Sequence, residues 1–97
     1  MPAKLSDVEI QRSLGTLSGW ARRGDALAKT FTFPRFADGI AFVGKVAGMA
    51  DAMDHHPDID IRYTKVTFTL STHSAGGITQ LDLDLAAKIE QGHGAAP

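Results

Sequence analysis

Cysteine is absent from this 97-residue chain, which excludes disulfide bonds, thiolate nucleophiles and cysteine-ligated zinc. Long apolar runs are absent too: no stretch approaches the roughly 20 residues that a transmembrane helix needs, and the first residues lack the apolar core of a signal peptide. Neither sign of charge dominates, because ten basic and eleven acidic residues are scattered along the chain. We therefore expect a cytoplasmic protein that binds neither membranes nor nucleic acids.

The composition is that of a folded globular protein. Hydrophobic residues make up 43% of the chain and charged residues 22%. A chain of this length favours one domain with one core, and neither an internal repeat nor a linker divides residues 1–97. We expect residues 92–97 to form a flexible tail.

The first third of the chain predicts a helix followed by a hairpin. Ser6 and Glu9 have the spacing of a capping box, which starts a helix, and Gly19 ends it. Two short extended runs follow, at residues 20–23 and 27–33, with a glycine-aspartate pair between them. Their separation favours a β-hairpin.

A long central helix is predicted from Phe36 to Met53, where apolar residues recur at helical spacing in two rows. Its apolar arc covers about half of the circumference, which is wider than the stripe of about 100 degrees that covers one core. The opposite arc carries small residues, among them Gly44 and Gly48. They indicate either the close approach of another backbone or an undemanding solvent face, and the sequence leaves both alternatives open.

The second half of the chain predicts two half-buried strands and a last helix. Apolar and polar residues alternate over residues 58–64 and again over 65–71, which is the period of strands with one buried face. His73 continues the polar side of the second alternation, so its imidazole should be open to solvent or ligand. Thr79 and Asp82 then have the spacing of a helix cap.

The order of these elements is helix, strand, strand, helix, strand, strand, helix. This order predicts a single α+β domain, with a four-stranded antiparallel sheet and helices packed on one face of it. The other face would remain open, and an uncovered edge strand favours pairing with a second subunit.

Three of the four histidines lie near the ends of one strand-like segment: His55 and His56 before it, and His73 after it. Histidine has an unperturbed pKa of roughly 6.5, so a convergent set favours proton transfer near neutral pH. His56 precedes a proline and should be extended, and adjacent extended residues point in opposite directions. His55 and His56 should therefore have different roles. A solvated loop pair is the plain alternative, and zinc is disfavoured because neither HxxxH nor HxH spacing occurs.

The same residues carry a family resemblance. The run Asp54-His55-His56-Pro57, followed by Leu70-Ser71-Thr72-His73 and then Asp82, resembles the signature of the pterin-4a-carbinolamine dehydratases. The similarity extends from about Leu17 to Glu90. It implies loss of water from a 4a-hydroxytetrahydropterin, such as 4a-hydroxytetrahydrobiopterin, giving the quinonoid dihydropterin. That reaction recycles tetrahydrobiopterin for an aromatic amino acid hydroxylase, with neither a metal nor an organic cofactor.

The resemblance also implies roles for single residues. His55 and His73 resemble the acid/base pair of the family, and His56 resembles the histidine that helps to bind the pterin ring. Asp82 would hold or polarise an active-site histidine, although an acid there also suits the helix dipole. Substrate contacts are further expected from five residues: Trp20, Asp51, Asp54, Ser71 and Thr72. Without the resemblance, the tryptophan would first be assigned to the core.

A second function is compatible with the same resemblance. Some members of the family act as dimerisation partners of transcription factors, so a non-catalytic binding module of the coactivator type is the alternative. The family also implies a homodimer or a homotetramer. The histidine set separates the two functions, because a pure interaction module would not need it.

Overall fold

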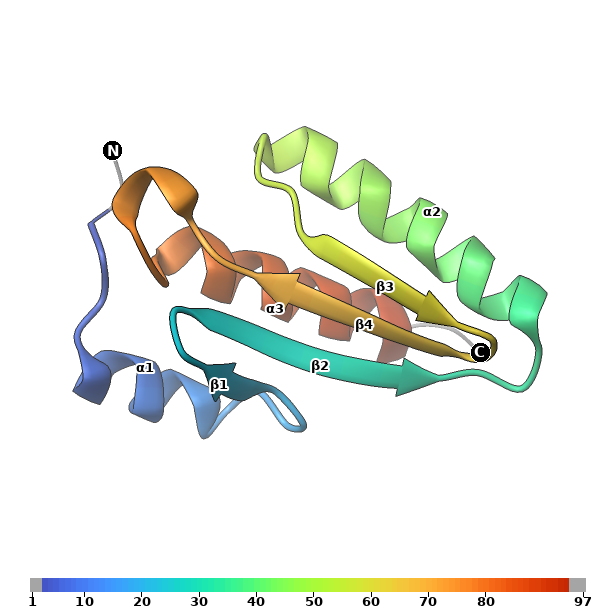
Figure 1. Cartoon of the computed structure of the whole chain (residues 1–97), viewed down its shortest axis with the longest axis horizontal. Coiled ribbons are helices and arrows are strands. Elements are labelled where there is room, and N and C mark those ends of the chain that lie inside the picture. Colours follow the sequence, from blue (N-terminus) through green and yellow to red (C-terminus); the bar gives the residue numbers. More distant parts are fainter. Residues whose placement is uncertain (1–2, 95–97) are drawn as a thin grey trace.

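The computed structural model describes residues 3–94, which form three α-helices, a 3-10 turn and one four-stranded sheet (Figure 1). The α+β fold predicted from the sequence is confirmed, with the elements in the predicted order. Their bounds are α1 Asp7–Leu14, β1 Ala21–Arg23, β2 Ala26–Thr32, α2 Phe36–Met53, β3 Asp58–Arg62, β4 Lys65–Leu70, η1 His73–Ala75 and α3 Gln80–Gly94.

The sheet has the strand order β1-β2-β4-β3, and every neighbouring pair is antiparallel. The central strands β2 and β4 pair over six residues, with Phe31 opposite Val66. Gly24 (φ 60°) and Tyr63 (φ 53°) have left-handed backbone in the two hairpin turns, where tight hairpins need a positive φ. Strand β3 is left at one edge, and all five of its residues are exposed.

The core lies between one face of the sheet and the helices. Val66, Phe68 and Leu70 alternate along β4 and are completely buried, as the period of two predicts. Leu85 and Ile89 of α3 belong to the same apolar cluster. Helix α2 packs against both α3 and β4, so the two long helices cover the same face (Figure 1).

Helix α1 ends earlier than the sequence suggests. It stops at Leu14 instead of continuing toward Gly19, because Gly15 caps it. The backbone N–H of Gly15 donates to the carbonyl of Arg12 over 3.2 Å, which is the hydrogen bond of a tight 3-10 turn. The chain beyond this turn then buries Leu17 in the core.

Helix α3 ends later than expected, at Gly94, so residues 92–94 of the predicted tail belong to it. Gly92 is buried against α2, and a Cβ at this position would lie only 2.5 Å from Cε of Met49. Packing against α2 therefore keeps residues 92–94 helical. The sequence does not reveal this, because a glycine contributes no apolar side chain to the helical pattern. Residues 95–97 of the predicted tail lie outside the described residues.

The small residues of α2 face open space in the single chain. A Cβ built at Gly44 or Gly48 would have nothing within 4 Å, which favours the solvent-face interpretation. Close packing occurs instead at Gly39, where a Cβ would lie 3.2 Å from Cγ2 of Val66. Among residues 3–94, neither α2 nor any other helix combines the length and apolar character that a membrane crossing requires.

Candidate active site

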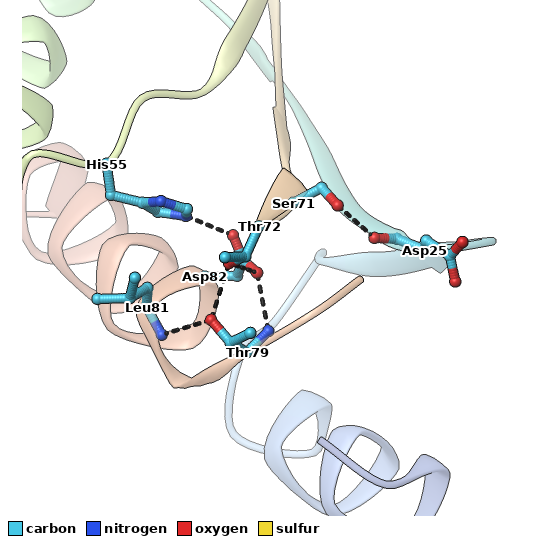
Figure 2. A network of polar contacts seen from close by, with 7 residues as sticks. All are labelled: Asp25, His55, Ser71, Thr72, Thr79, Leu81 and Asp82. Carbon is cyan, nitrogen blue, oxygen red and sulfur yellow. Dashed lines mark hydrogen bonds and ion pairs between the residues drawn. The ribbon is translucent and has the colours of Figure 1, made fainter. Parts of the chain in front are cut away.

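Three segments meet at one end of the sheet: the link between α2 and β3, the chain from β4 into η1, and the first turn of α3 (Figure 2). They line an open cavity of about 320 Å³. This volume lies at the lower end of the roughly 300–1,000 Å³ typical of ligand sites. The lining residues are Asp54, His55, His56, Ser71, Thr72, His73, Ser74 and Leu81. The three histidines of the sequence motif thus share one cavity.

The end of α2 determines the direction of His55. Asp54 ends the helix with left-handed backbone (φ 50°), and the N–H of His55 then donates to the carbonyl of Ala50 over 3.1 Å. This turn carries the imidazole toward α3, where only 9% of His55 is exposed (Figure 2). Nε2 of His55 lies 2.6 Å from Oδ1 of Asp82.

Asp82 is a completely buried carboxylate in the first turn of α3. Oδ1 faces His55, while Oδ2 accepts two hydrogen bonds, from the hydroxyl of Thr72 and from the backbone N–H of Thr79, each over 2.9 Å. A buried charge requires such partners. The bond to Thr79 is the capping contact expected from the sequence, so Asp82 joins the start of α3 to a cavity histidine.

His56 points away from this buried network. Its Nε2 lies 2.9 Å from Oδ1 of Asp51, and both side chains are largely exposed. Asp51 belongs to the last turn of α2, where an acid is unfavourable for the helix dipole. An exposed imidazole beside a carboxylate, at the rim of a cavity, is suited to binding a polar ring and exchanging protons with water.

His73 reaches the cavity from a different segment of the chain. Strand β4 ends at Leu70, and His73 is the first residue of the 3-10 turn η1. Gly76 closes this turn with left-handed backbone (φ 76°), and its N–H donates to the carbonyl of His73 over 3.1 Å. The side chain of His73 is exposed, so its imidazole is open to solvent and to the cavity.

A family model described as pterin 4 alpha carbinolamine dehydratase matches residues 3–92. The chain belongs to this family. It is 55% identical over 91 residues to a protein of Roseiflexus sp. (strain RS-1) that is provisionally named a pterin-4-alpha-carbinolamine dehydratase, covering 94% of this chain and 98% of that relative. A relative with the same provisional name from Mycobacteroides abscessus is 53% identical, over 91% of this chain and 94% of its own.

Two solved structures are similar to this chain in fold. The crystal structure of a transcriptional coactivator/pterin dehydratase from Brucella melitensis has a TM-score of 0.88 at 33% identity, covering 92% of this chain and 97% of that one. A pterin dehydratase-like protein described as a RuBisCO assembly factor in the alpha-carboxysome has a TM-score of 0.67 at 26% identity. It covers 78% of this chain and 90% of its own.

The other residues that the dehydratase resemblance places at the substrate are distributed unevenly. Asp54 and Ser71 line the cavity, and the hydroxyl of Ser71 donates to the carbonyl of Asp25 over 2.7 Å. Thr72 lines it too, but its hydroxyl is buried and is directed to Asp82. The structure does not bring Trp20 to the cavity: this residue is buried in the core.

Trp20 lies away from the cavity, between α3 and β2. Its indole N–H donates to Oε1 of Glu90 in α3 over 2.8 Å, and Glu90 also pairs with Lys29 of β2. The Trp20 ring lies edge-on to Phe31, with centroids 6.4 Å apart. These contacts assign it to the packing of α3 against β2, which is the core position expected for a lone tryptophan without the resemblance.

Sequence reasoning did not assign Ser74 and Leu81 to the cavity, although both line it. It gave Thr79 the role of a helix cap only, and not that of a support for a site residue. The sequence does indicate that Thr72 points inward. It continues the alternation in which residues 66, 68 and 70 of β4 are buried. Within residues 3–94, no group of three histidine or acidic side chains is arranged to hold a metal ion.

Proposed function

We propose that this chain catalyses the loss of water from a 4a-hydroxytetrahydropterin, giving the quinonoid dihydropterin. Membership of the pterin carbinolamine dehydratase family supports a dehydratase. The observation that carries the proposal for this chain is that two histidines with different surroundings line one cavity. His55 is buried and held by Asp82, whereas His73 is exposed. General acid/base catalysis of an elimination needs two such groups.

The reaction is an elimination without a change of oxidation state. N5 of the pterin loses its proton, and the electron pair of that N–H bond forms the C4a=N5 double bond. The C4a–O bond breaks at the same time, and the hydroxyl oxygen takes a proton and leaves as water. Proton transfers balance this step, so we propose no metal and no organic cofactor.

His55 is suited to be the base. Asp82 can only accept at Oδ1, so Nε2 of His55 carries the hydrogen of that bond. Among residues 3–94, Nδ1 of His55 forms no hydrogen bond, and no buried side-chain nitrogen lacks a partner, so Nδ1 is not fully buried. Because His55 lines the cavity, we place Nδ1 on the cavity side. Nδ1 then takes the proton of N5, and the carboxylate of Asp82 stabilises the positive charge that the ring gains.

His73 is suited to be the acid. Its exposed ring can take a proton from water and give it to the oxygen at C4a, after which it is recharged by solvent. His56, braced by Asp51, would bind the pterin ring from the rim. Asp54 and Ser71 would contribute polar contacts to the same ring. Positioned proton transfer of this kind contributes about 10² to 10⁴-fold to a rate.

The physiological setting completes the proposal. The quinonoid product would be recycled to tetrahydrobiopterin for an aromatic amino acid hydroxylase in the cytoplasm. The enzyme would work as a homodimer or a homotetramer. Strand β3 supports this part, because it is an exposed edge strand with unpaired backbone groups on its outer side.

The test is the rate of dehydration of freshly generated carbinolamine, with the spontaneous rate subtracted. His55→Ala and His73→Ala should each lower the enzymatic rate at least about tenfold, and the double variant should lower it further. His93→Ala is the matched control, because this fourth histidine contacts the rings of Phe31 and Phe42 and does not line the cavity. A double variant with the native rate would refute the proposal.

A second candidate function is a binding module, which is suggested by the description of the Brucella melitensis relative as a transcriptional coactivator. The observation in this chain is a group of large exposed apolar residues on and beside β3: Ile59 (37% exposed), Ile61 (40%) and Tyr63 (76%). Sedimentation of the native chain and of Ile61→Lys tests whether β3 joins subunits. If it does, the substitution should shift the chain toward the monomer, while the histidine variants should not.

A further inference from the structure

We infer that Thr72 and Thr79 are positioning residues, whose hydroxyl groups form a one-way chain of hydrogen bonds that holds Asp82 and thereby fixes the tautomer of His55. The chain places the proton of the neutral His55 ring on Nε2 and leaves the lone pair of Nδ1 for the substrate. This inference rests on the proposed function, in which Nδ1 is the proton acceptor.

The two hydroxyl groups lie behind the cavity, on the far side of Asp82 from His55 (Figure 2). Thr72 is 4% exposed and Thr79 is completely buried. Their Oγ1 atoms are 2.8 Å apart, and Oγ1 of Thr72 is 2.9 Å from Oδ2 of Asp82. The backbone N–H of Leu81 donates to Oγ1 of Thr79 over 3.2 Å. Water has little access to this arrangement, so its hydrogen bonds must be satisfied internally.

The direction of these hydrogen bonds follows from the number of hydrogens. A hydroxyl has one hydrogen to donate, and a carboxylate oxygen only accepts. Thr72 therefore gives its hydrogen to Asp82, and Thr79 must give its own to the oxygen of Thr72. Oγ1 of Thr79 accepts from the N–H of Leu81, so the sequence of donors runs only one way.

This direction decides the state of His55. Oδ2 of Asp82 receives two donors, the Thr72 hydroxyl and the Thr79 N–H, and cannot turn toward His55 without leaving both unpaired. Oδ1 therefore stays opposite Nε2 at 2.6 Å and requires a hydrogen there. Removal of the Thr72 hydroxyl takes away one donor and also leaves the Thr79 hydroxyl without its acceptor. Oδ2 then keeps only the Thr79 N–H, so the carboxylate is held less firmly opposite Nε2 and the alternative tautomer of His55 becomes more accessible.

The test compares Thr72→Val, which keeps the shape and removes the hydroxyl, with Thr72→Ser, which restores it. The tautomer of His55 is read from the ¹⁵N shifts of its ring in the uniformly labelled full chain, at an alkaline pH where imidazole is neutral. The His55 signals are identified by their loss in His55→Ala. Thr67→Val is the matched control, because Thr67 forms a threonine hydroxyl pair with Thr30 at 2.7 Å on the exposed face of the sheet.

We expect the native chain to show His55 with the proton on Nε2, and Thr72→Val to show a mixture of tautomers. Its kcat for dehydration should fall at least about tenfold with KM changed less than about twofold, because the loss acts through the base. Thr72→Ser should restore both readings, and Thr67→Val should alter neither. Thr79→Ser keeps the hydroxyl and should resemble the native chain.

Two results would overturn the inference. One is a native His55 that carries its proton on Nδ1, which needs no variant to be folded. The other is a folded Thr72→Val with the native tautomer and the native kcat. A native chain that shows the Nε2 tautomer but no dehydration above the spontaneous rate would refute the proposed function and leave the positioning role in place.

Discussion

Replacement of Asp82 by asparagine nearly preserves the shape of the side chain but should affect its contact with His55 more than its contact with the Thr79 backbone. Three hydrogen-bond donors converge on this carboxylate: Nε2–H of His55, the hydroxyl of Thr72 and the backbone N–H of Thr79. An amide has only one acceptor oxygen. That oxygen should take the position of Oδ2, where two donors meet and one of them belongs to the backbone. The amide nitrogen then faces Nε2 of His55.

This geometry gives the size of the expected effect. A donor opposite Nε2 forces His55 into the tautomer with its proton on Nδ1, so the cavity loses the proton acceptor. We expect Asp82→Asn to lower the enzymatic rate by about 10²-fold to 10⁴-fold, which is the usual contribution of a positioned base. The free energy of unfolding should fall only moderately. A hydrogen bond to a charged group contributes about 1.5–3 kcal/mol to it, and a loss of 1 kcal/mol lowers Tm by about 4–8 °C in a domain of this size.

The assay pairs the dehydration rate with thermal unfolding of the same preparation. Asp84→Asn is the control, since Asp84 lies two residues further along α3, is exposed, and accepts a hydrogen bond from the exposed side chain of Gln80 over 2.8 Å. The control should keep the native rate and nearly the native Tm. If Asp82→Asn loses Tm as expected but keeps most of its rate, Asp82 is only a helix cap and the tautomer reasoning is wrong.

Three further predictions concern other parts of the chain. The backbone N–H of Ser6, and then its side chain, hold the pKa of Glu9 below its usual 4.5, so Glu9 stabilises the fold above that pH and loses this contribution as the pH falls. The Tm advantage of the native chain over Glu9→Gln should therefore shrink between about pH 6 and about pH 3 in calorimetry. Gly92→Ala should lower stability by about 1–3 kcal/mol in urea unfolding, because its Cβ would lie 2.5 Å from a methionine methyl, whereas Gly48→Ala should raise it by up to about 1 kcal/mol. His56→Ala should mainly raise KM for the pterin, and an unchanged KM would remove its binding role.

The helices and strands that were predicted best are those with a regular pattern of apolar residues. The central helix over 36–53 and the alternation along β4 carry long regular patterns, and both appear as predicted. The ends of α1 and α3 were harder to predict, because a glycine lies at or near each of them. Gly15 stops α1, whereas Gly92 continues α3 because α2 packs against it. A glycine in a sequence does not show which of these two surroundings it will have.

The candidate site could be predicted in its residue types more than in its contacts. Backbone alternation separated His55 from His56, and in the structure their ring nitrogens meet different carboxylates. The partner of each histidine depends on how α2 and α3 pack, which no local pattern contains. Trp20 is present as the resemblance implies, but in this chain it is buried and bonded to Glu90, so its expected contact with the substrate stays a prediction.

Asp82 would link folding to the proposed chemistry, because the same carboxylate contacts the start of α3 and His55. Its Oδ2 accepts the Thr79 N–H that begins α3, and its Oδ1 holds His55. Formation of the first turn of α3 therefore also orients the histidine. Removal of the Asp82 side chain, as in Asp82→Ala, cannot separate these roles, since both bonds are then lost together. Thr72 can separate them, because its hydroxyl contacts the side chains of Asp82 and Thr79 but forms no hydrogen bond with the backbone of α3 among the described residues. A loss of rate in Thr72→Val at native helix stability would thus show that orientation, not capping, is what catalysis requires of Asp82.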